Sequence, residues 1–448
     1  MTRPPLPAGP YLVIGLARSG VAAALALRSR GLEVLGSDRA GLAPPALADA
    51  GVEIVEHSSA ALERAGCVVK SPGVRASEPL IAAARARGLP VIGELELAWR
   101  MLPNEFVAVT GTNGKTTTVE LLGAIYRASG REVAVAGNVG RALSLLAVPP
   151  PHGEAPLDPR TTIVCEASSF QLEDTEAFAP HAAVLLNIAP DHLDRHGDMA
   201  AYIAAKLRAF ANQGAEDIAV LPAGELAALE LGGAPRRVTF GNVAEADMRG
   251  DERWLWWHGE RFIARSEIRL RGPHNAENAM AAAAAALECG LPGDGVRAGL
   301  ASFAGVAHRL EEVATRDGVS FVNDSKGTNV ASTRVALRSF APRSVRLILG
   351  GRSKGEDFAE LADDVAVAAR AVYLIGEAAE EIAAALATAS ALAGFELADC
   401  GTLERALAAA RAQAVAGEVV LLSPACTSFD QFTDYEQRGE EFRRLVLA

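Results

Sequence analysis

The stretch FVAVTGTNGKTTT, Phe106 to Thr118, decides the fold of the middle of this chain. An apolar run that ends in glycine indicates a buried β-strand, and the threonines after the lysine open a helix. Gly111 and Gly114 let the backbone between them turn its N–H groups inward, and Lys115 adds a cation. The common phosphate-loop pattern has a glycine where this chain has Val109, so the loop is shorter than the common one. The stretch predicts a nucleotide-phosphate site made by Gly111, Thr112, Asn113, Gly114, Lys115, Thr116 and Thr117.

The composition around this stretch indicates a large α/β protein. A chain of 448 residues is long enough for about three domains. Half of the residues are hydrophobic but only 5% are aromatic, which favours Ala/Leu/Val-packed helices over parallel strands. The net charge of −12 argues against nucleic acid or an anionic membrane surface as a partner.

The cysteines and the apolar segments bear on where the protein works. The five cysteines are widely spaced and never form a C-x-x-C pair, so they predict neither a disulfide framework nor a zinc site. No apolar run reaches the roughly 18 residues of a membrane span, and the first residues lack a signal-peptide core. We therefore expect a cytoplasmic protein without a membrane span, acting as a monomer.

Short Val/Ile/Leu runs recur along the chain, each followed by a polar loop and then an Ala-rich helical stretch. This alternation predicts βα units and parallel sheets. Three series of such units place the domain boundaries near residues 102 and 306, giving domains over 1–102, 103–306 and 307–448. The segment WLWWHGERF, Trp254 to Phe262, predicts a hairpin whose tryptophans favour core or interface packing over a binding role.

Two groups of candidate metal ligands follow strands in the same series as Lys115. Glu166 lies in CEASSFQLE, and Asp191, His192 and Asp194 lie in PDHLDRHG. Carboxylate and imidazole groups near nucleotide phosphates suit a divalent cation with mostly oxygen ligands, as Mg²⁺ prefers. The alternative for DHLD is a helix-capping turn with a solvated histidine.

Lys206 stands out in DMAAYIAAKLRAFANQ. Met199, Ile203, Leu207 and Phe210 form an apolar stripe at helical spacing, and Lys206 falls within its arc. A buried bare ammonium is costly, so spacing alone favours a lysine that snorkels or pairs with a carboxylate.

The outer segments carry weaker signals. GLARSG, Gly15 to Gly20, with Asp38 after the next strand, is similar to a dinucleotide fingerprint, but Ala17 replaces its middle glycine. Ser19 and the helix start can still take a phosphate, which favours some nucleotide over a hydride-transfer cofactor. In the last third, Lys326 and Lys354 follow strands together with hydroxyl residues, which suits an anionic small molecule, the alternative being scattered surface lysines.

Taken in order, these motifs resemble the bacterial Mur ligase family. TGTNGKTTT, AGNVG, SSFQLE, DHLDRHG, YIAAKLR, GPHNAENAMAA, HRLE, NDSKGTN and GGRSKGEDF run through nearly the whole chain, and such a set is far more specific than any one of its members. The resemblance implies a Rossmann-like N-terminal domain, a central phosphate-loop ATPase domain and a Rossmann-like C-terminal domain. The ending LLSPACTSFDQFTDYEQRGEEF is similar to that of members that add D-glutamate to UDP-N-acetylmuramoyl-L-alanine.

The resemblance also implies an activity, which is ATP-driven amide formation in peptidoglycan precursor synthesis. A carboxylate is a poor electrophile, so ATP first phosphorylates the alanyl carboxylate, and the D-glutamate amine then attacks the acyl phosphate. Lys115 and Mg²⁺ would stabilise the charge that develops during phosphoryl transfer. Two Mg²⁺ ions are implied, with ATP as the co-substrate.

By matching position, the resemblance assigns roles to particular residues. Lys115, His192 and Lys206 would be catalytic, with Lys206 carbamylated into a carboxylate-like ligand. The metal ligands would be Thr116, Glu166, His192 and carbamylated Lys206. Asn275, Arg309 and Asp324 would complete the ATP site, and Ser19, Asp38, Ser71 and Asn138 would bind the UDP substrate. D-glutamate would meet Thr328, Lys354, Ser428 and Tyr435.

Two positions depart from the family pattern. Arg39 stands where a small hydroxyl residue is frequent, which puts the uracil contacts in doubt, and Tyr435 stands where phenylalanine is common, which could add a hydrogen bond to the amino acid.

Other functions remain open from the sequence. The loop from Gly111 to Thr117 could belong to a kinase or nucleotide switch without ligase activity, or be a plain helix start with an exposed lysine. The segment from Gly15 to Gly20 could serve a nicotinamide-dependent dehydrogenase. A sister ligase adding another amino acid or acting on folate is the nearest alternative, although folate-type enzymes lack the first domain.

Overall fold

The computed structural model describes residues 3–270 and 272–448, and it confirms the α/β class expected from the sequence. Three sheets are present, and the chain divides into two compact units. The first unit is Met1–Ile268 with His274–Phe303, and the second is Arg269–Pro273 with Ala304–Ala448. Within the described residues, none of the helices is long and apolar enough to cross a membrane. The three-domain division stays a prediction, since the first unit contains two sheets.

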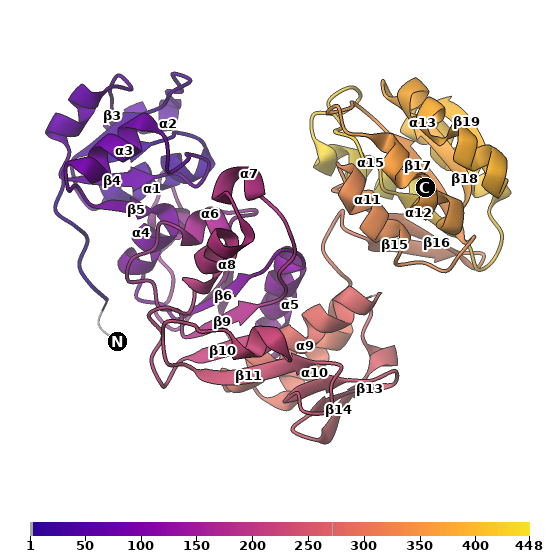
Figure 1. The fold of residues 1–448 in the computed structure, drawn as a ribbon, viewed down its shortest axis with the longest axis horizontal. Helices are drawn as coiled ribbons and strands as arrows, with labels where there is room; N and C mark the ends of the chain where they lie inside the picture. Colours follow the sequence, from indigo (N-terminus) through magenta and orange to yellow (C-terminus); the bar gives the residue numbers. More distant parts are fainter. Residues whose placement is uncertain (1–2, 271) are drawn as a thin grey trace. The chain divides into compact units, whose positions relative to one another are not determined.

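The first sheet has five parallel strands in the order β3-β2-β1-β4-β5 (Figure 1). This order changes direction beside β1, so the loops after β1 and β4 share the carboxyl edge where ligands bind in open parallel sheets. The strands are β1 (Tyr11–Ile14), β2 (Val34–Ser37), β3 (Glu53–Ile54), β4 (Cys67–Lys70) and β5 (Val91–Gly93). The helices are α1 (Arg18–Ser29), α2 (Pro45–Asp49), α3 (Pro79–Ala86) and α4 (Glu94–Met101), with a 3-10 turn over Ser59–Arg64.

The central sheet has nine strands in the order β14-β13-β12-β11-β10-β9-β6-β8-β7. Strands β7 to β12 pair in parallel through β6, whereas β12, β13 and β14 pair antiparallel and form the predicted tryptophan hairpin. The strands are β6 (Phe106–Thr110), β7 (Val133–Gly137), β8 (Thr162–Glu166), β9 (Ala182–Leu185), β10 (Ile218–Pro222), β11 (Arg236–Gly241), β12 (Met248–Gly250), β13 (Trp254–Trp257) and β14 (Glu260–Ala264). The helices are α5 (Lys115–Ala128), α6 (Ser169–Leu172), α7 (Leu193–His196), α8 (Met199–Leu207), α9 (Pro273–Glu288) and α10 (Gly293–Ser302), and 3-10 turns cover Leu143–Ala147, Glu225–Ala228 and Arg265–Glu267.

Helix α4 joins the first sheet to the central one. Leu97 and Met101 pack into the core of the first sheet, whereas Leu95 and Trp99 pack into the core of the central sheet. Glu96, on the same helix, has no exposed side-chain surface and accepts hydrogen bonds from three consecutive backbone N–H groups of residues 176–178. These contacts explain why residues on both sides of the boundary predicted near 102 belong to one compact unit.

The third sheet lies in the second unit and has six strands in the order β15-β16-β20-β17-β18-β19, parallel except for the β15–β16 pair. The strands are β15 (Glu311–Arg316), β16 (Val319–Asn323), β17 (Val345–Gly350), β18 (Ala369–Ile375), β19 (Glu396–Gly401) and β20 (Val419–Leu422). The helices are α11 (Val330–Leu337), α12 (Ala362–Ala368), α13 (Ala379–Ala393), α14 (Leu403–Gln413) and α15 (Tyr435–Leu447), with a 3-10 turn over Phe358–Leu361.

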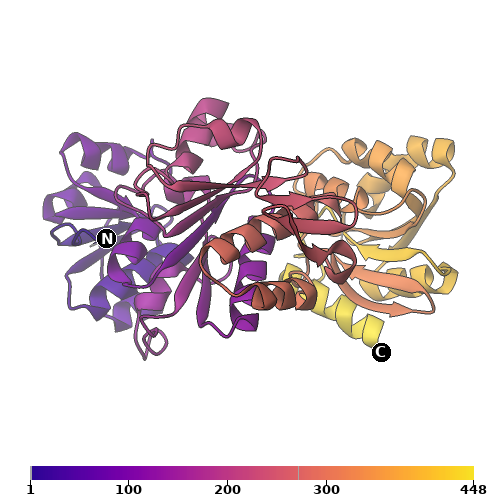
Figure 2. The ribbon, with the colours of Figure 1, turned by 90° about the horizontal axis from the view of Figure 1, so that it is seen from below.

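Helix α10 packs against α5, the helix that begins at the phosphate loop; the two helices α9 and α10 are drawn in salmon in Figure 2. The close approach depends on Gly299, because a Cβ there would lie 2.5 Å from Cα of Ile125. Side-chain atoms do not reach that distance from a backbone atom, so any larger residue must push the helices apart.

We expect Gly299→Ala to lower the free energy of unfolding by about 1–3 kcal/mol, the usual cost of overpacking a core. Chemical denaturation of the purified protein measures it. The matched control is Gly293→Ala in the same helix, where a Cβ would meet nothing closer than 3.5 Å. The control should be neutral or slightly stabilising, because alanine favours helix more than glycine does. Equal stability of the two variants would contradict the packing argument.

Candidate functional site

The phosphate loop lies between β6 and α5, at the carboxyl edge of the central sheet. Gly114 ends the loop at φ +84°, and a Cβ there would lie 2.2 Å from Oδ1 of Asn278. Thr116, in the first turn of α5, donates a hydrogen bond of 2.7 Å to Glu166, which ends β8. The amide of Asn138, in the loop after β7, donates to the other oxygen of the same carboxylate at 3.0 Å. Thr116, Glu166 and Asn138 thus meet at one point beside the loop.

Two lysine ammonium groups meet at the carbonyl oxygen of Gly111, where the loop begins. Nζ of Lys115 lies 2.9 Å from this oxygen and Nζ of Lys206 lies 2.7 Å from it. Lys206 is 1% exposed. Burial and the nearby Lys115 ammonium lower the pKa of Lys206 to about 7. The lowered pKa favours the uncharged amine, and an uncharged amine is a nucleophile.

Helix α8 places Lys206 at the loop. Nζ of Lys206 lies 4.5 Å from the ring centre of Tyr202, one turn earlier, and the hydroxyl of Tyr202 lies 3.1 Å from Oγ1 of Thr112. The apolar stripe expected here is partly wrong. Tyr202, Ala205 and Lys206 are the buried residues of the helix, whereas Met199, Ile203 and Leu207 are only half-buried and Phe210 lies beyond its end. The buried face turns toward the phosphate loop because its polar atoms find partners there.

Asparagine side chains contact the loop at two adjacent residues, Asn113 and Gly114. Asn187, just after β9, accepts from the backbone N–H of Asn113 at 2.9 Å and donates to its carbonyl at 3.1 Å. On α9, Asn278 donates to Oδ1 of Asn275 at 3.1 Å, and both are buried. Asn275, expected at the ATP site, is therefore one helical turn from the side chain that touches Gly114.

His192 begins α7 in a left-handed backbone conformation, with φ +52°. Its ring is half-exposed, lies 3.4 Å from the carboxylate of Asp191 and packs at 4.7 Å on the ring of Phe170. Non-glycine residues in this conformation are strained, and such strain gathers at functional sites.

Two of the expected metal ligands, Thr116 and Glu166, lie in contact and have oxygen atoms to offer a metal ion. Thr116 and Glu166 offer the hard oxygen ligands that Mg²⁺ prefers. Across residues 3–270 and 272–448, no group of three His, Cys, Asp or Glu side chains is placed to hold a metal ion.

The candidates for the UDP substrate in the first sheet surround the loop after β1. The Asp38 carboxylate accepts from the backbone N–H of Leu16 at 2.7 Å, and Oγ of Ser71 donates to the carbonyl of Gly15 at 2.6 Å. Ser19 lies half-buried in the first turn of α1. A Cβ on Gly20 would lie 1.8 Å from the Gly15 carbonyl, so this turn requires glycine.

Asn138 belongs to the central sheet, but its loop is tied to the first one. Arg18, at the start of α1, donates to the carbonyl of Gly140 at 2.7 Å. Arg39 lines a cavity of about 510 Å³ with His57, Ser58 and Glu78. The structure thus groups Ser19, Asp38 and Ser71 closely, while Asn138 contacts Glu166 directly.

The remaining ATP candidates lie in the second unit. Asp324, after β16, accepts from Oγ of Ser423 at 2.7 Å and from the backbone N–H of Leu310 at 3.2 Å. Burial raises the pKa of Asp324 to about 6, although Ser423 and the Arg309 guanidinium lower it. Arg309 itself is exposed and close enough to affect this carboxylate electrostatically.

The candidates for D-glutamate lie on loops that follow β16, β17 and β20, which are adjacent strands. Backbone hydrogen bonds join these loops, from Ala425 to Gly327 at 2.8 Å and between Arg352 and Thr427 in both directions. Within the described chain, the side chains of the four candidates are not hydrogen-bonded to one another. Lys354 pairs with Glu356 at 3.7 Å, the Tyr435 hydroxyl donates to Glu436 at 3.0 Å, Ser428 is buried and Thr328 is half-buried.

Arg438, on α15, holds these loops in place. It is 1% exposed and donates to the carbonyls of Ser325, Cys426 and Thr427 at 2.9–3.2 Å. One guanidinium therefore fixes the loop after β16 to the loop after β20, and Arg suits this role because its five donors form a rigid fork.

The sequence of this chain matches family models and known proteins. A family model described as the Mur ligase middle domain matches residues 109–286, and one described as Mur ligase, glutamate ligase domain matches residues 308–426. The chain is 44% identical to a UDP-N-acetylmuramoylalanine–D-glutamate ligase of Anaeromyxobacter dehalogenans, with 100% of this chain and 99% of that protein covered. A protein of the same name from Acidobacterium capsulatum is 42% identical, with 98% and 96% covered. The chain belongs to the Mur ligase family.

Solved Mur ligase structures share the fold. UDP-N-acetylmuramate-alanine ligase MurC from Thermotoga maritima superimposes with a TM-score of 0.60 at 22% identity, covering 98% of this chain and 99% of that one. MurF from Acinetobacter baumannii gives a TM-score of 0.58 at 19% identity, covering 80% and 82%. At these identities the likeness is one of fold.

Four residues that contact the candidate loops were not predicted from the sequence: Asn187, Tyr202, Asn278 and Arg438. Tyr202 had a usable signal, because it precedes Lys206 by one helical turn. Asn278 had one too, since it follows Asn275 by three residues. Asn187 and Arg438 act on backbone groups of distant segments, which leaves no local pattern.

The lowered pKa of Lys206 has a consequence for stability. Its folded-state pKa of about 7 lies below the ordinary value of 10.5, so between these values the unfolded chain binds more protons. The free energy of unfolding therefore rises with pH across this window. Lys206→Met removes this titration, so the variant should gain most over the wild type below about pH 7 and progressively less toward about pH 10. Urea unfolding in CO₂-free buffer measures this, and a gain that is constant with pH would contradict the buried ammonium.

Proposed function

We propose that this chain is an ATP-dependent ligase that joins D-glutamate to UDP-N-acetylmuramoyl-L-alanine through an acyl phosphate, releasing ADP and phosphate. It would act in the cytoplasm, as a monomer, in peptidoglycan precursor synthesis. The observation that carries the proposal is the loop Gly111 to Thr117 with Glu166 and Lys206 at one sheet edge, in a chain over 40% identical at full length to ligases of this name.

The loop and the start of α5 would bind the ATP phosphates. Backbone N–H groups at a helix start attract anions, and the Lys115 ammonium adds a positive charge to them. Thr116 and Glu166 would hold Mg²⁺, which when bound neutralises charge on the phosphate oxygens during transfer. Asn275 would lie along the nucleotide, and Arg309 and Asp324 would complete the ATP site.

The reaction would proceed in two steps. An oxygen of the alanyl carboxylate attacks the γ-phosphorus, the bond to the β-phosphate oxygen breaks and ADP leaves. The amine of D-glutamate, after losing a proton, then attacks the acyl carbon, and phosphate leaves with the acyl oxygen. Lys115 would stabilise the charge on the transferred phosphoryl group.

His192 and Lys206 would serve a second Mg²⁺, with Lys206 as a carbamate. The buried, partly uncharged amine of Lys206 can add CO₂, which replaces a costly ammonium by an anion near the Lys115 cation. The left-handed backbone at His192 would fix its ring at the same edge.

The substrate ends would meet the remaining candidates. Ser19 and Asp38 would bind the UDP moiety, and Ser71 and Asn138 would contact the sugar end. D-glutamate would meet Thr328, Lys354, Ser428 and Tyr435.

Phosphate release should require ATP, UDP-N-acetylmuramoyl-L-alanine and D-glutamate together. We expect L-glutamate, L-alanine, L-lysine and diaminopimelate to give no more than background, because the amide step would not complete. A coupled phosphate assay with each amino acid in turn measures this. Lys115→Ala is the control and should reduce the rate by about 10²–10³, the usual effect of removing one charge-stabilising group.

The alternatives give different results in the same assay. Phosphate release without any amino acid would indicate a nucleotide hydrolase or kinase. Release with a different amino acid only would indicate a sister ligase.

Lys206→Ala should lose most activity and regain part of it when a short carboxylic acid such as acetate or formate is added. The acid would supply the carboxylate that the carbamate provides. Lys115→Ala is the matched control and should not respond to acid, because the group it lacks is a cation. Failure of acids to restore any activity to a folded Lys206→Ala protein would contradict the carbamate.

A further inference from the structure

Lysine is rare in this chain, which has five lysines among its 43 basic residues. Arginine serves almost everywhere else as the cation. Four of the lysines, Lys115, Lys206, Lys326 and Lys354, lie in or beside the candidate loops of the two units. The fifth, Lys70, has no assigned role and lies at the end of β4 with no exposed side-chain surface.

The ammonium group of Lys70 lies between three oxygen atoms. It donates 2.7 Å to the carbonyl of Val74, lies 2.7 Å from Oδ2 of Asp174 and lies 3.3 Å from Oε1 of Glu173. Glu173 and Asp174 follow α6 of the central sheet, so the cluster joins the first sheet to the central one inside a single compact unit. A lysine has three donors on a compact point charge, which this pocket matches and a planar guanidinium would not.

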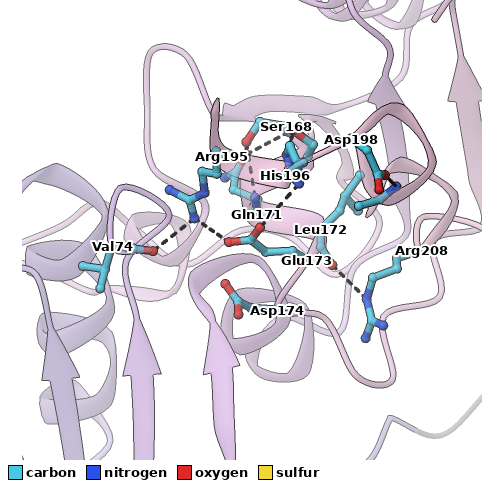
Figure 3. A network of polar contacts seen from close by, with 12 residues as sticks. Val74, Ser168, Gln171, Leu172, Glu173, Asp174, Arg195, His196, Asp198 and Arg208 are labelled. Carbon is cyan, nitrogen blue, oxygen red and sulfur yellow. Dashed lines mark hydrogen bonds and ion pairs between the residues drawn. The ribbon is translucent and has the colours of Figure 1, made fainter. Parts of the chain in front are cut away.

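Glu173 links this ammonium to a second cation, Arg195 on α7. Figure 3 shows Arg195 pointing at both the Glu173 carboxylate and the Val74 carbonyl. The bond from Arg195 to Val74 is 3.0 Å long, and the guanidinium also packs at 4.1 Å on the ring of Phe170. Lys70 at the end of β4 and Arg195 on α7 therefore both donate to the carbonyl oxygen of Val74, and both pair with Glu173.

Val74 is held at its amide as well, because its backbone N–H donates to the carbonyl of Ser71 at 3.0 Å. Ser71 begins this loop and contacts Gly15 beside the candidate UDP site. Arg195 lies three residues after His192 on α7, so the cluster connects the loop of Ser71 to the segment of His192.

We propose that Lys70, Glu173 and Arg195 are positioning residues that set the loop of Ser71 against α7, and so place the UDP-linked acceptor relative to the phosphate loop. None of the three touches the reacting atoms. This inference rests on the proposed function, because it requires a UDP-linked acceptor at Ser71. Displacing a positioned substrate by about 1 Å can cost up to about 100-fold in rate, so a moderate loosening of the cluster should be measurable.

The test uses the full chain and Glu173→Gln, which keeps the shape of the side chain and leaves Asp174 to pair with Lys70. We expect KM for UDP-N-acetylmuramoyl-L-alanine to rise about tenfold while KM for ATP stays within about twofold. Calorimetric titration with UDP-N-acetylmuramoyl-L-alanine, without ATP, should show the same loss of affinity. Arg195→Lys keeps the charge but loses the fork that reaches Val74 and Glu173 together, and should give the same pattern.

Glu176→Gln is the matched control. Glu176 also pairs with a cation near the contact between the first and central sheets, Arg100 at 2.9 Å, but it is exposed and does not contact Val74. It should leave both KM values unchanged. If Glu173→Gln does not fold, Arg195→Lys alone decides. The two changes combined should raise KM less than the product of the single effects, because both act on one contact.

Several outcomes would overturn the proposal. Unchanged KM for the UDP substrate with a lowered melting temperature would show a structural role only, and equal rises for both substrates would show general disruption. The wild-type protein distinguishes failure of the positioning role from failure of the proposed function. If the wild type neither binds nor uses the UDP substrate, the function itself is refuted.

Discussion

The carbonyl oxygen of Gly111 is the point on which the central site depends. Lys115 comes to it from α5 and Lys206 from α8, so one backbone atom links two helices and the end of β6. Both ammonium groups gain a hydrogen bond, but each raises the cost of the other's charge. Burial, and to a smaller extent the Lys115 ammonium, lowers the pKa of Lys206 to about 7.

A negatively charged carboxylate, that of Glu166, lies where the loop passes into α5. Glu166 accepts from Thr116 and from Asn138, so a carboxylate and a hydroxyl lie at the first turn of α5 while the two cations lie at the loop's start. Phosphoryl transfer needs cations near the transferred oxygens and oxygen ligands for the metal ion. The strand order explains how both are supplied: β6 lies between β8 and β9, so its loop is flanked by Glu166 on one side and Asn187 on the other.

Sequence reasoning reached the fold class and the strands that carry the loops, because these depend on local apolar runs and helical spacing. From spacing alone it favoured a Lys206 that snorkels or pairs with a carboxylate, whereas the structure buries Lys206 against the carbonyl of Gly111, a distant backbone atom that helical spacing does not record. The contacts of Lys70 were not predicted for a similar reason. It ends an ordinary buried strand, and its three partners are between 4 and about 100 residues away, at distances no local pattern records.

The candidate residues for the substrates are divided unequally between the two units, and the second unit carries the ATP candidates Arg309 and Asp324 together with those for D-glutamate. The phosphate loop and the candidates for the UDP substrate lie in the first unit, whose two sheets share the cores around α4 and the cluster of Lys70. Their mutual geometry is therefore fixed by packing and buried ion pairs before any substrate binds, which lowers the entropic cost of bringing a carboxylate to the γ-phosphate. The candidates for D-glutamate lie in the second unit, on loops held by Arg438. On the proposed function, the acyl phosphate would form mainly at a preorganised site in the first unit. The loops after β17 and β20 would select the amine, whereas the loop after β16 also carries Asp324, a candidate for the ATP site, so changes there would affect the phosphoryl step as well.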